Sequence, residues 1–110
     1  MPPSLRIDAW TWRASATDGV AVATGTVTNI SDTTARGVSA TVEFYAADGS
    51  LVATGTAHTH ERILGPGETT DFEAKARYDA RITSARLTFI ARGGRLLKTS
   101  ETVEAPARRH

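Results

Sequence analysis

A strict alternation of apolar and polar side chains from Gly37 to Ala47 constrains the fold of this chain more than any other feature. Every second residue of the segment is apolar, namely Val38, Ala40, Val42, Phe44 and Ala46. Because successive side chains of a β-strand point to opposite faces of the sheet, the pattern predicts a strand with one buried and one solvent-exposed face. Asp48-Gly49 readily supplies the positive φ angles of a tight turn, so Ser50 to His58 is predicted to return as the partner strand.

The rest of the chain repeats this organisation, and no long window has the apolar spacing of an amphipathic helix. The seven predicted strands are Leu5–Ala14, Val20–Ile30, Gly37–Ala47, Ser50–His58, Thr70–Tyr78, Ile82–Arg92 and Arg95–Val103. Turn residues separate these strands at a spacing of roughly ten residues. Such a series is typical of an all-β, seven-stranded antiparallel sandwich of two sheets, immunoglobulin-like in type, with a small closed barrel as the alternative.

The inward faces of these strands predict the hydrophobic core, whose members are Leu5, Ile7, Val27, Val38, Val42, Phe44, Phe72, Leu87 and Phe89. A chain of 110 residues has the size of one domain, and we expect a core from residue 5 to 104 and a flexible tail from 105 to 110. No apolar run approaches the roughly 18 residues that a membrane-spanning helix needs. We therefore expect no membrane insertion by this segment.

Charge and cysteine content exclude several classes of protein. A net charge of +1 lacks the basic excess that indicates nucleic-acid binding, and the absence of cysteine excludes disulfides and thiolate chemistry. Met1-Pro2-Pro3 has neither the charged nor the apolar region of a signal peptide. We expect either a mature domain excised from an exported precursor or a cytoplasmic protein, and the sequence carries no signature of an oligomeric state.

Gly65-Pro66-Gly67-Glu68 is the most emphatic turn signal in the chain. A phosphate-binding loop would need a lysine and a following helix, and the sequence offers neither. Proline instead fixes φ where a chain leaves a strand, and glycine permits the positive φ of a tight turn. We expect a corner between the two sheets that leads into the strand carrying Phe72, with Gly67 at positive φ.

His58 and His60 are the best candidates for metal ligands, because residues two apart on a strand project from one face. Two ligands are too few for a closed zinc site, and the only other histidine is His110.

Asp71 and Glu73 share a face, but the basic residues that follow indicate a solvated charge ladder. No serine or threonine lies in a nucleophile motif such as G-x-S-x-G. We therefore expect no enzyme activity, no metal and no cofactor.

Trp10 and Trp12 are two residues apart and therefore face the same side of a strand. Continuing the alternation of the preceding apolar residues would place both rings on the outer side. A β-bulge near Asp8-Ala9 would return them to the core, and we favour this interpretation because large aromatic side chains pack readily. Otherwise the pair forms an exposed aromatic platform, with Tyr45 near it, suited to a sugar ring or a protein partner.

Several short segments occur in a fixed order, namely Gly25 to Asn29, Val42 to Gly49, and Leu64 to Glu68 followed by Phe72. In this order they resemble the FxLYD family and related immunoglobulin-like, fibronectin-type-III-like domains of bacterial and archaeal exported proteins. Phe44 and Asp48 match the F and D of the name-giving motif, whereas Ala46 and Ala47 stand at its leucine and tyrosine positions. The resemblance implies a non-catalytic accessory module of membrane-anchored or secreted proteins.

We therefore predict a non-enzymatic interaction or spacer module that binds a protein partner. The resemblance implies a bacterial extracytoplasmic or cell-envelope assembly as its location. Trp10, Trp12 and Tyr45 are the expected partner surface, and the alternative function is a carbohydrate-binding module that uses Trp10 and Trp12.

Overall fold

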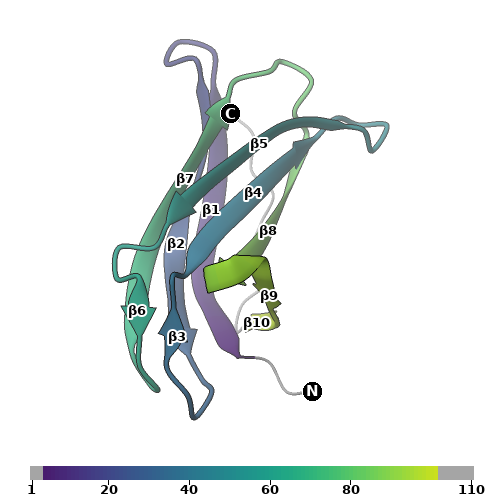
Figure 1. Ribbon diagram of the computed structural model, residues 1–110. Coiled ribbons are helices and arrows are strands. Elements are labelled where there is room, and N and C mark those ends of the chain that lie inside the picture. The colour runs from purple at the N-terminus through teal and green to yellow at the C-terminus, as the bar shows by residue number, and fades with distance from the viewer. Residues whose placement is uncertain (1–3, 102–110) are drawn as a thin grey trace.

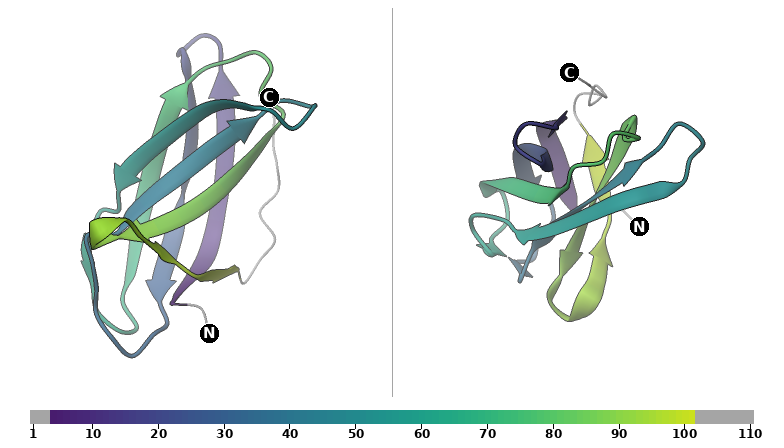
Figure 2. Two further views of the ribbon diagram at one scale, coloured as in Figure 1. Left: turned by 45° about the vertical axis from the view of Figure 1, so that its right-hand side comes forward. Right: turned by 90° about the horizontal axis from the view of Figure 1, so that it is seen from above.

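The two main β-sheets of the described residues pack as separate layers, as the views in Figures 1 and 2 show. This computed structural model describes residues 4–101, so Met1-Pro2-Pro3 and residues 102–110 lie outside the described part. The first sheet contains β1 (Leu5–Ser15), β2 (Val20–Asn29), β7 (Thr69–Arg77) and β10 (Thr99–Glu101), in the order β10-β1-β2-β7. The second contains β4 (Ser39–Tyr45), β5 (Leu51–His58), β8 (Ser84–Ala91) and β9 (Arg95–Leu97), in the order β5-β4-β8-β9.

The predicted all-β sandwich is confirmed, and the first six predicted strands form with ends displaced by a few residues. Residues along β7 alternate between exposed and buried from end to end, with the charged side chains outside as predicted. Two further elements are too short to give a periodic signal in the sequence, β3 (Ala35–Arg36) and β6 (Ile63–Leu64), which pair with each other. A single 3-10 turn, η1 (Arg92–Gly94), precedes β9.

The last predicted strand, Arg95–Val103, is divided between the two sheets. Its first part, β9, pairs antiparallel with β8, and its second part, β10, pairs parallel with β1. The chain passes from the second sheet to the first at Lys98. The Lys98 carbonyl accepts hydrogen bonds from the Ser4 and Leu5 backbone amides at 2.8 and 3.2 Å. The expectation of a purely antiparallel sandwich is therefore wrong at this pair, because the chain changes sheets without reversing its direction. The last two residues of the predicted strand lie outside the described part.

All nine predicted core residues are buried, with exposed fractions between 0% and 9%. The core contains two edge-to-face aromatic pairs, Trp12 with Phe44 at 5.7 Å and Phe72 with Phe89 at 5.3 Å between ring centroids. Burying a large apolar side chain contributes about 1.5–3 kcal/mol, so these inward faces supply most of the stability. Small residues also belong to the core, and the fully buried alanines are Ala21, Ala23, Ala40 and Ala74.

The β-bulge expected near Asp8-Ala9 is confirmed, because the register of β1 against β2 shifts between Ile7 and Ala9. Asp8 is the extra residue, and its carboxylate accepts hydrogen bonds from Arg6 Nε at 2.7 Å and from Thr28 Oγ1 at 2.5 Å. Partial burial opposes the ionisation of Asp8, but these hydrogen bonds and the Arg6 charge outweigh it and hold the pKa of Asp8 below its usual value. A Cβ at Gly25 would collide with the Ala9 carbonyl and the Trp10 backbone, so glycine is required beside the bulge.

One lateral side of the sandwich is closed where β5, which runs diagonally in Figure 1, meets β7. A Cβ at Gly55 of β5 would overlap the Lys75 carbonyl of β7, so the two strands approach at backbone distance only because residue 55 is glycine. Just beyond the end of β5, the His60 amide donates to the Asp71 carbonyl at 2.9 Å. These contacts join the two sheets along this side.

The Gly65-Pro66-Gly67-Glu68 segment forms the turn between β6 and β7, with the Glu68 amide donating to the Gly65 carbonyl at 3.0 Å. Gly67 has φ of 81°, as predicted, and follows proline as in a type II turn. The buried Asn29 at the end of β2 anchors the turn, because its backbone exchanges hydrogen bonds with Gly67 and Glu68. The Asn29 side-chain amide also donates to the Leu64 carbonyl at 2.7 Å.

Replacing Gly67 with valine should lower the free energy of unfolding by roughly 1 kcal/mol or more, because a β-branched residue is strained at positive φ. Nothing lies within 4 Å of a Cβ at this position, so the cost is conformational rather than steric crowding by neighbours. Gly67→Asn is the matched control, and its free energy of unfolding should fall by less, since asparagine tolerates positive φ. Urea denaturation measures both, and a Gly67→Val variant as stable as the wild type would contradict the assignment.

Candidate interaction face

The outer face of the second sheet carries a cluster of polar and aromatic side chains on its two central strands. We call it the β4–β8 face and define it by Thr41, Glu43 and Tyr45 of β4 with Arg86 and Thr88 of β8. These residues point outward because the alternating residues of both strands, among them Phe44 and Leu87, are buried in the core. The strand register places Glu43 opposite Arg86 and Thr41 opposite Thr88.

Tyr45 is held in a fixed position on this face by both of its charged neighbours. Its hydroxyl donates to Glu43 Oε1 at 2.8 Å, and the Arg86 guanidinium lies 5.9 Å from the centre of its ring. The hydrogen bond to Glu43, together with desolvation and the Glu43 charge, raises the pKa of Tyr45 above its usual value, and the Arg86 charge only partly offsets this. The ring therefore stands as a neutral, oriented aromatic group beside a cation.

Hydroxyl groups and apolar side chains surround this cluster. Thr41 and Thr56 are in hydrogen-bond contact through their hydroxyls at 3.1 Å. Leu51 pairs with Tyr45 across the β4–β5 hairpin and is 54% exposed, and Leu96 pairs with Ile90 and is 69% exposed. The face thus combines an aromatic ring, an arginine and exposed aliphatic groups on a rigid sheet, a composition enriched at protein interfaces.

The tryptophans lie elsewhere, because the bulge at Asp8 turns them toward the interior. Trp12 is 2% exposed and packs against Phe44, and Trp10 is partly buried against the core. The exposed Trp10–Trp12 platform considered for a sugar ring therefore does not form, and Tyr45 is the member of the predicted partner surface that lies on the β4–β8 face. Sequence analysis missed Arg86 as its companion, since the register between β4 and β8 joins segments about forty residues apart.

His58 and His60 line one hollow of about 450 Å³, together with Asp71 and Glu73 of β7. Thr59 between them is buried, so the two histidines share a side as their spacing predicted. Within residues 4–101, however, no three histidine, aspartate or glutamate side chains are arranged to hold a metal ion. Lys75 lies 3.9 Å from Glu73, which fits the expected solvated charge ladder.

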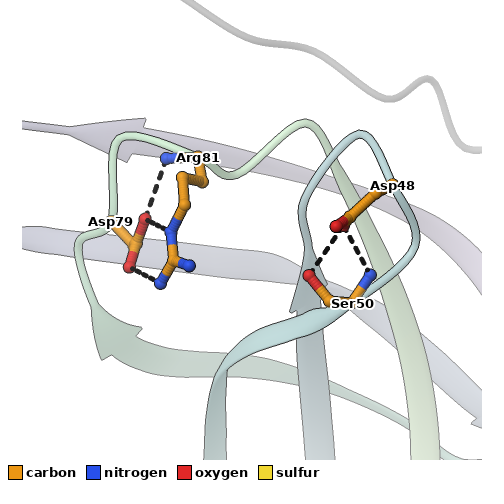
Figure 3. A network of polar contacts seen from close by, with 4 residues as sticks. All are labelled: Asp48, Ser50, Asp79 and Arg81. Carbon is orange, nitrogen blue, oxygen red and sulfur yellow. Dashed lines mark hydrogen bonds and ion pairs between the residues drawn. The ribbon is translucent and has the colours of Figure 1, made fainter.

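Two neighbouring loops at one end of the sandwich contain carboxylates with local partners, drawn in Figure 3. Asp48 accepts hydrogen bonds from the Ser50 hydroxyl at 2.7 Å and the Ser50 amide at 3.0 Å. Asp79 accepts from Arg81 Nε at 3.0 Å, from Arg81 Nη2 at 2.9 Å and from the Arg81 amide at 2.8 Å. These bonds lower the pKa of Asp79 to about 2, and both carboxylates stiffen their turns.

Comparison with solved structures supports the immunoglobulin-like sandwich. The fold is similar to part of a β-glucuronidase from Bacteroides uniformis, with a TM-score of 0.63 and 17% identity over 86% of this chain and 13% of that one. It is also similar to part of a glycoside hydrolase family 2 β-glucuronidase, with a TM-score of 0.60 and 9% identity over 87% of this chain and 12% of that one. IrmA of Escherichia coli matches with a TM-score of 0.54 and 13% identity over 89% of this chain and 94% of that one.

These likenesses establish the fold alone, since all three identities are low. The chain spans about one eighth of the length of the two glucuronidases. No protein-family model matches the sequence, and no curated protein is significantly similar to it. The resemblance to the FxLYD family therefore depends on the short motifs alone, whereas the wider sandwich class has structural support. No helix in the described part of the chain is long and apolar enough to cross a membrane.

Replacing Glu43 with glutamine should lower the pKa of Tyr45 toward its usual value, because it removes the carboxylate that accepts the phenol hydrogen bond and repels the phenolate. The chain contains two tyrosines, so an ultraviolet absorbance titration should show one component moving to lower pH. Thr41→Ala, on the same face, is the control and should leave the titration unchanged. Coincident curves for Glu43→Gln and the wild type would contradict the observed contact.

Replacing Arg81 with glutamine should raise the pKa of Asp79 from about 2 toward the usual carboxyl value near 4. A lowered pKa in the folded state stabilises the protein at pH values above the carboxyl pKa of the unfolded chain. That contribution is lost as the pH falls toward about 2. The wild type should therefore lose stability between roughly pH 4 and pH 2 more steeply than Arg81→Gln. NMR titration of the Asp79 carboxyl tests the shift directly, and an unchanged midpoint in the variant would refute it.

Proposed function

We propose that this chain is a non-enzymatic, immunoglobulin-like interaction module that binds a protein partner through the β4–β8 face. The observation that carries the proposal is the oriented cluster of Tyr45, Glu43 and Arg86 on the outer face of a rigid sheet. Tyrosine and arginine are among the residues that most often dominate binding energy at interfaces. Holding Tyr45 in place before binding reduces the entropy lost when the complex forms.

Exposed leucines give this surface the apolar area that a protein partner requires. Leu51 lies beside Tyr45. Leu96 is exposed on the same side of the sheet, on the edge strand β9. Hydroxyl groups such as Thr41 and Thr56 between these apolar groups supply hydrogen bonds at low side-chain entropy cost. This mixture is better suited to a polypeptide than to a sugar ring, for which a second exposed aromatic ring is missing among the described residues of the face.

The fold comparisons support a modular role. Domains similar to this chain occur as about one eighth of the two glucuronidases and as most of IrmA. Carried over to this chain, these matches support an accessory module rather than a catalytic one. The FxLYD-like motifs support a place in a bacterial extracytoplasmic or cell-envelope assembly. A carbohydrate ligand on the β4–β8 face is the competing outcome, since the parent proteins of two matches are named as glycosidases.

The experiment compares a double variant of the β4–β8 face with a matched variant on the opposite sheet. Tyr45→Ala/Arg86→Glu removes the aromatic ring and reverses the charge, whereas Thr26→Ala/Lys75→Glu shortens one side chain to alanine and reverses one charge on the outer face of the first sheet. Proteins captured by the wild-type chain from its own organism are identified and purified, and their affinities are measured by calorimetry. The first variant should weaken binding about tenfold or more, and the second should not.

Equal losses with both variants, or no loss with either, would refute the placement on the β4–β8 face. Titration with polysaccharides gives the other arm of the test. Binding of a polysaccharide that is abolished by Tyr45→Ala would replace a protein partner with a carbohydrate ligand on the same face.

A further inference from the structure

Four arginines lie where three separate segments of the chain meet beside the start of β4. Arg36 lies on β3, which pairs with the strand β6 that begins directly after Arg62. The Val38 amide donates to the Arg62 carbonyl at 3.2 Å. A Cβ at Gly37 would lie 3.1 Å from the Arg92 Cβ, so the turn between β8 and β9 packs against the residue that follows Arg36. Figures 1 and 2 show this turn, the yellow-green coil η1, beside the start of β4.

The fourth arginine, Arg95, follows the same turn at the start of β9. We define the arginine patch as Arg36, Arg62, Arg92 and Arg95. All four side chains are exposed, and among residues 4–101 none of them has a carboxylate within 4 Å. Glu61, which precedes Arg62, instead lies 3.8 Å from His60.

The arginine patch concentrates positive charge on one part of a chain that is nearly neutral as a whole. The net charge of the chain is +1, and without the four arginines nine basic and twelve acidic side chains remain. The remainder of the chain is therefore negative. An anionic surface attracts the patch and repels the rest, so it would orient the molecule with the patch toward it.

Exposed aliphatic side chains lie next to these arginines. Ile63 is opposite Arg36 in the pairing of β3 with β6 and is 55% exposed. Leu96 directly follows the patch residue on β9 and is 69% exposed. Nothing lies within 4 Å of a Cβ at Gly93 or Gly94, so the tip of the turn stands clear of the rest of the molecule. The patch can therefore bring both charged and aliphatic groups against an extended surface.

We propose that the arginine patch binds the surface of an anionic phospholipid membrane. The guanidinium groups contact lipid phosphates, and the side chains of Ile63 and Leu96 enter the headgroup layer. Arginine presents a planar fork of donors that matches two phosphate oxygens at once. Clusters of four or more basic residues bind anionic lipids, and adjoining apolar side chains add a second attraction to the membrane surface. The chain would lie on the bilayer without crossing it.

The composition of the patch favours lipid over the other common polyanions. Single-stranded nucleic acids are bound by aromatic side chains that stack on the bases, and none of the four arginines or two aliphatic neighbours supplies a ring. An acidic protein partner is likewise expected to meet aromatic anchor residues. Exposed aliphatic groups between arginines suit the boundary between lipid headgroups and acyl chains.

The patch and the β4–β8 face lie at opposite ends of β4. Tyr45 ends that strand about 20 Å from Ser39, at about 3.3 Å per residue. A membrane at the patch therefore leaves the cluster around Tyr45 accessible. This inference does not depend on the protein partner proposed for the β4–β8 face.

Co-sedimentation with lipid vesicles tests the proposal. The wild type should bind vesicles of phosphatidylglycerol mixed with phosphatidylcholine, should not bind phosphatidylcholine alone, and should dissociate as the salt concentration rises. Arg36→Glu/Arg92→Glu should weaken binding to the anionic vesicles about tenfold or more, since each basic residue near such a surface strengthens binding roughly fivefold.

The control is Arg13→Glu/Arg77→Glu, which makes the same change in net charge near the far ends of β1 and β7. It should change the affinity by less than about twofold at physiological ionic strength, where charges are screened beyond about 8 Å. Thermal unfolding checks that both variants are folded. The corresponding glutamine variants repeat the comparison without added carboxylates if a glutamate variant is not folded.

A second pair of variants tests the aliphatic contact. Ile63 and Leu51 are equally exposed, at 55% and 54%, but only Ile63 lies beside the patch. Ile63→Ser should weaken binding to the anionic vesicles about threefold or more, because less apolar area leaves water on binding. Leu51→Ser should leave the affinity close to that of the wild type.

Three results would overturn the proposal: absence of binding to the anionic vesicles, equal binding to both lipid compositions, or equal losses within either pair of variants. Binding of poly-L-glutamate or of a single-stranded oligonucleotide without binding of the vesicles would also overturn it, since the patch would then serve another polyanion.

Discussion

The β-bulge at Asp8 decides which side chains of β1 after Ile7 face the core. The arrangement of the aromatic core depends on this choice. Ile7 and Trp12 both point inward only because one extra residue lies between Ile7 and Ala9. Without this residue the indole of Trp12 would face solvent and Phe44 would lose its edge-to-face partner. Thr28 and Arg6 hold the bulge through the Asp8 carboxylate. Replacing a large core aromatic with alanine typically lowers the free energy of unfolding by about 3–5 kcal/mol. The contacts of the Asp8 carboxylate therefore have a large effect on stability.

Two glycines and one asparagine allow neighbouring segments to approach each other closely through their backbones. Gly25 makes room for the bulge, and Gly55 lets β5 approach the backbone of β7. Asn29 satisfies the polar groups of a buried strand end by binding the Leu64 carbonyl and the turn at Gly67. Of these contacts, the approach of Gly55 to the Lys75 carbonyl connects the two layers, and the buried apolar faces hold the layers together in a chain that has no cysteine.

The β4–β8 face is a consequence of the same alternation that builds the core. Burying Phe44 obliges Glu43 and Tyr45 to project outward, and burying Leu87 does the same for Arg86. The register between β4 and β8 then brings these three side chains together. Changes to the hydrophobic pattern of either strand would therefore alter the outer surface as well, because core and face are two sides of one backbone.

The sequence by itself determined the strands, the inward and outward faces, the bulge and the positive φ of Gly67, because each depends on a two-residue period or on the local conformational limits of glycine and proline. It did not reveal that the last strand divides at Lys98 or that Ala35–Arg36 pairs with Ile63–Leu64. It also did not reveal the contact between Tyr45 and Arg86. Those features follow from the register between segments far apart in the chain. Only the tertiary structure decides that register, since alternation specifies which side a residue faces but not which distant residue lies beside it.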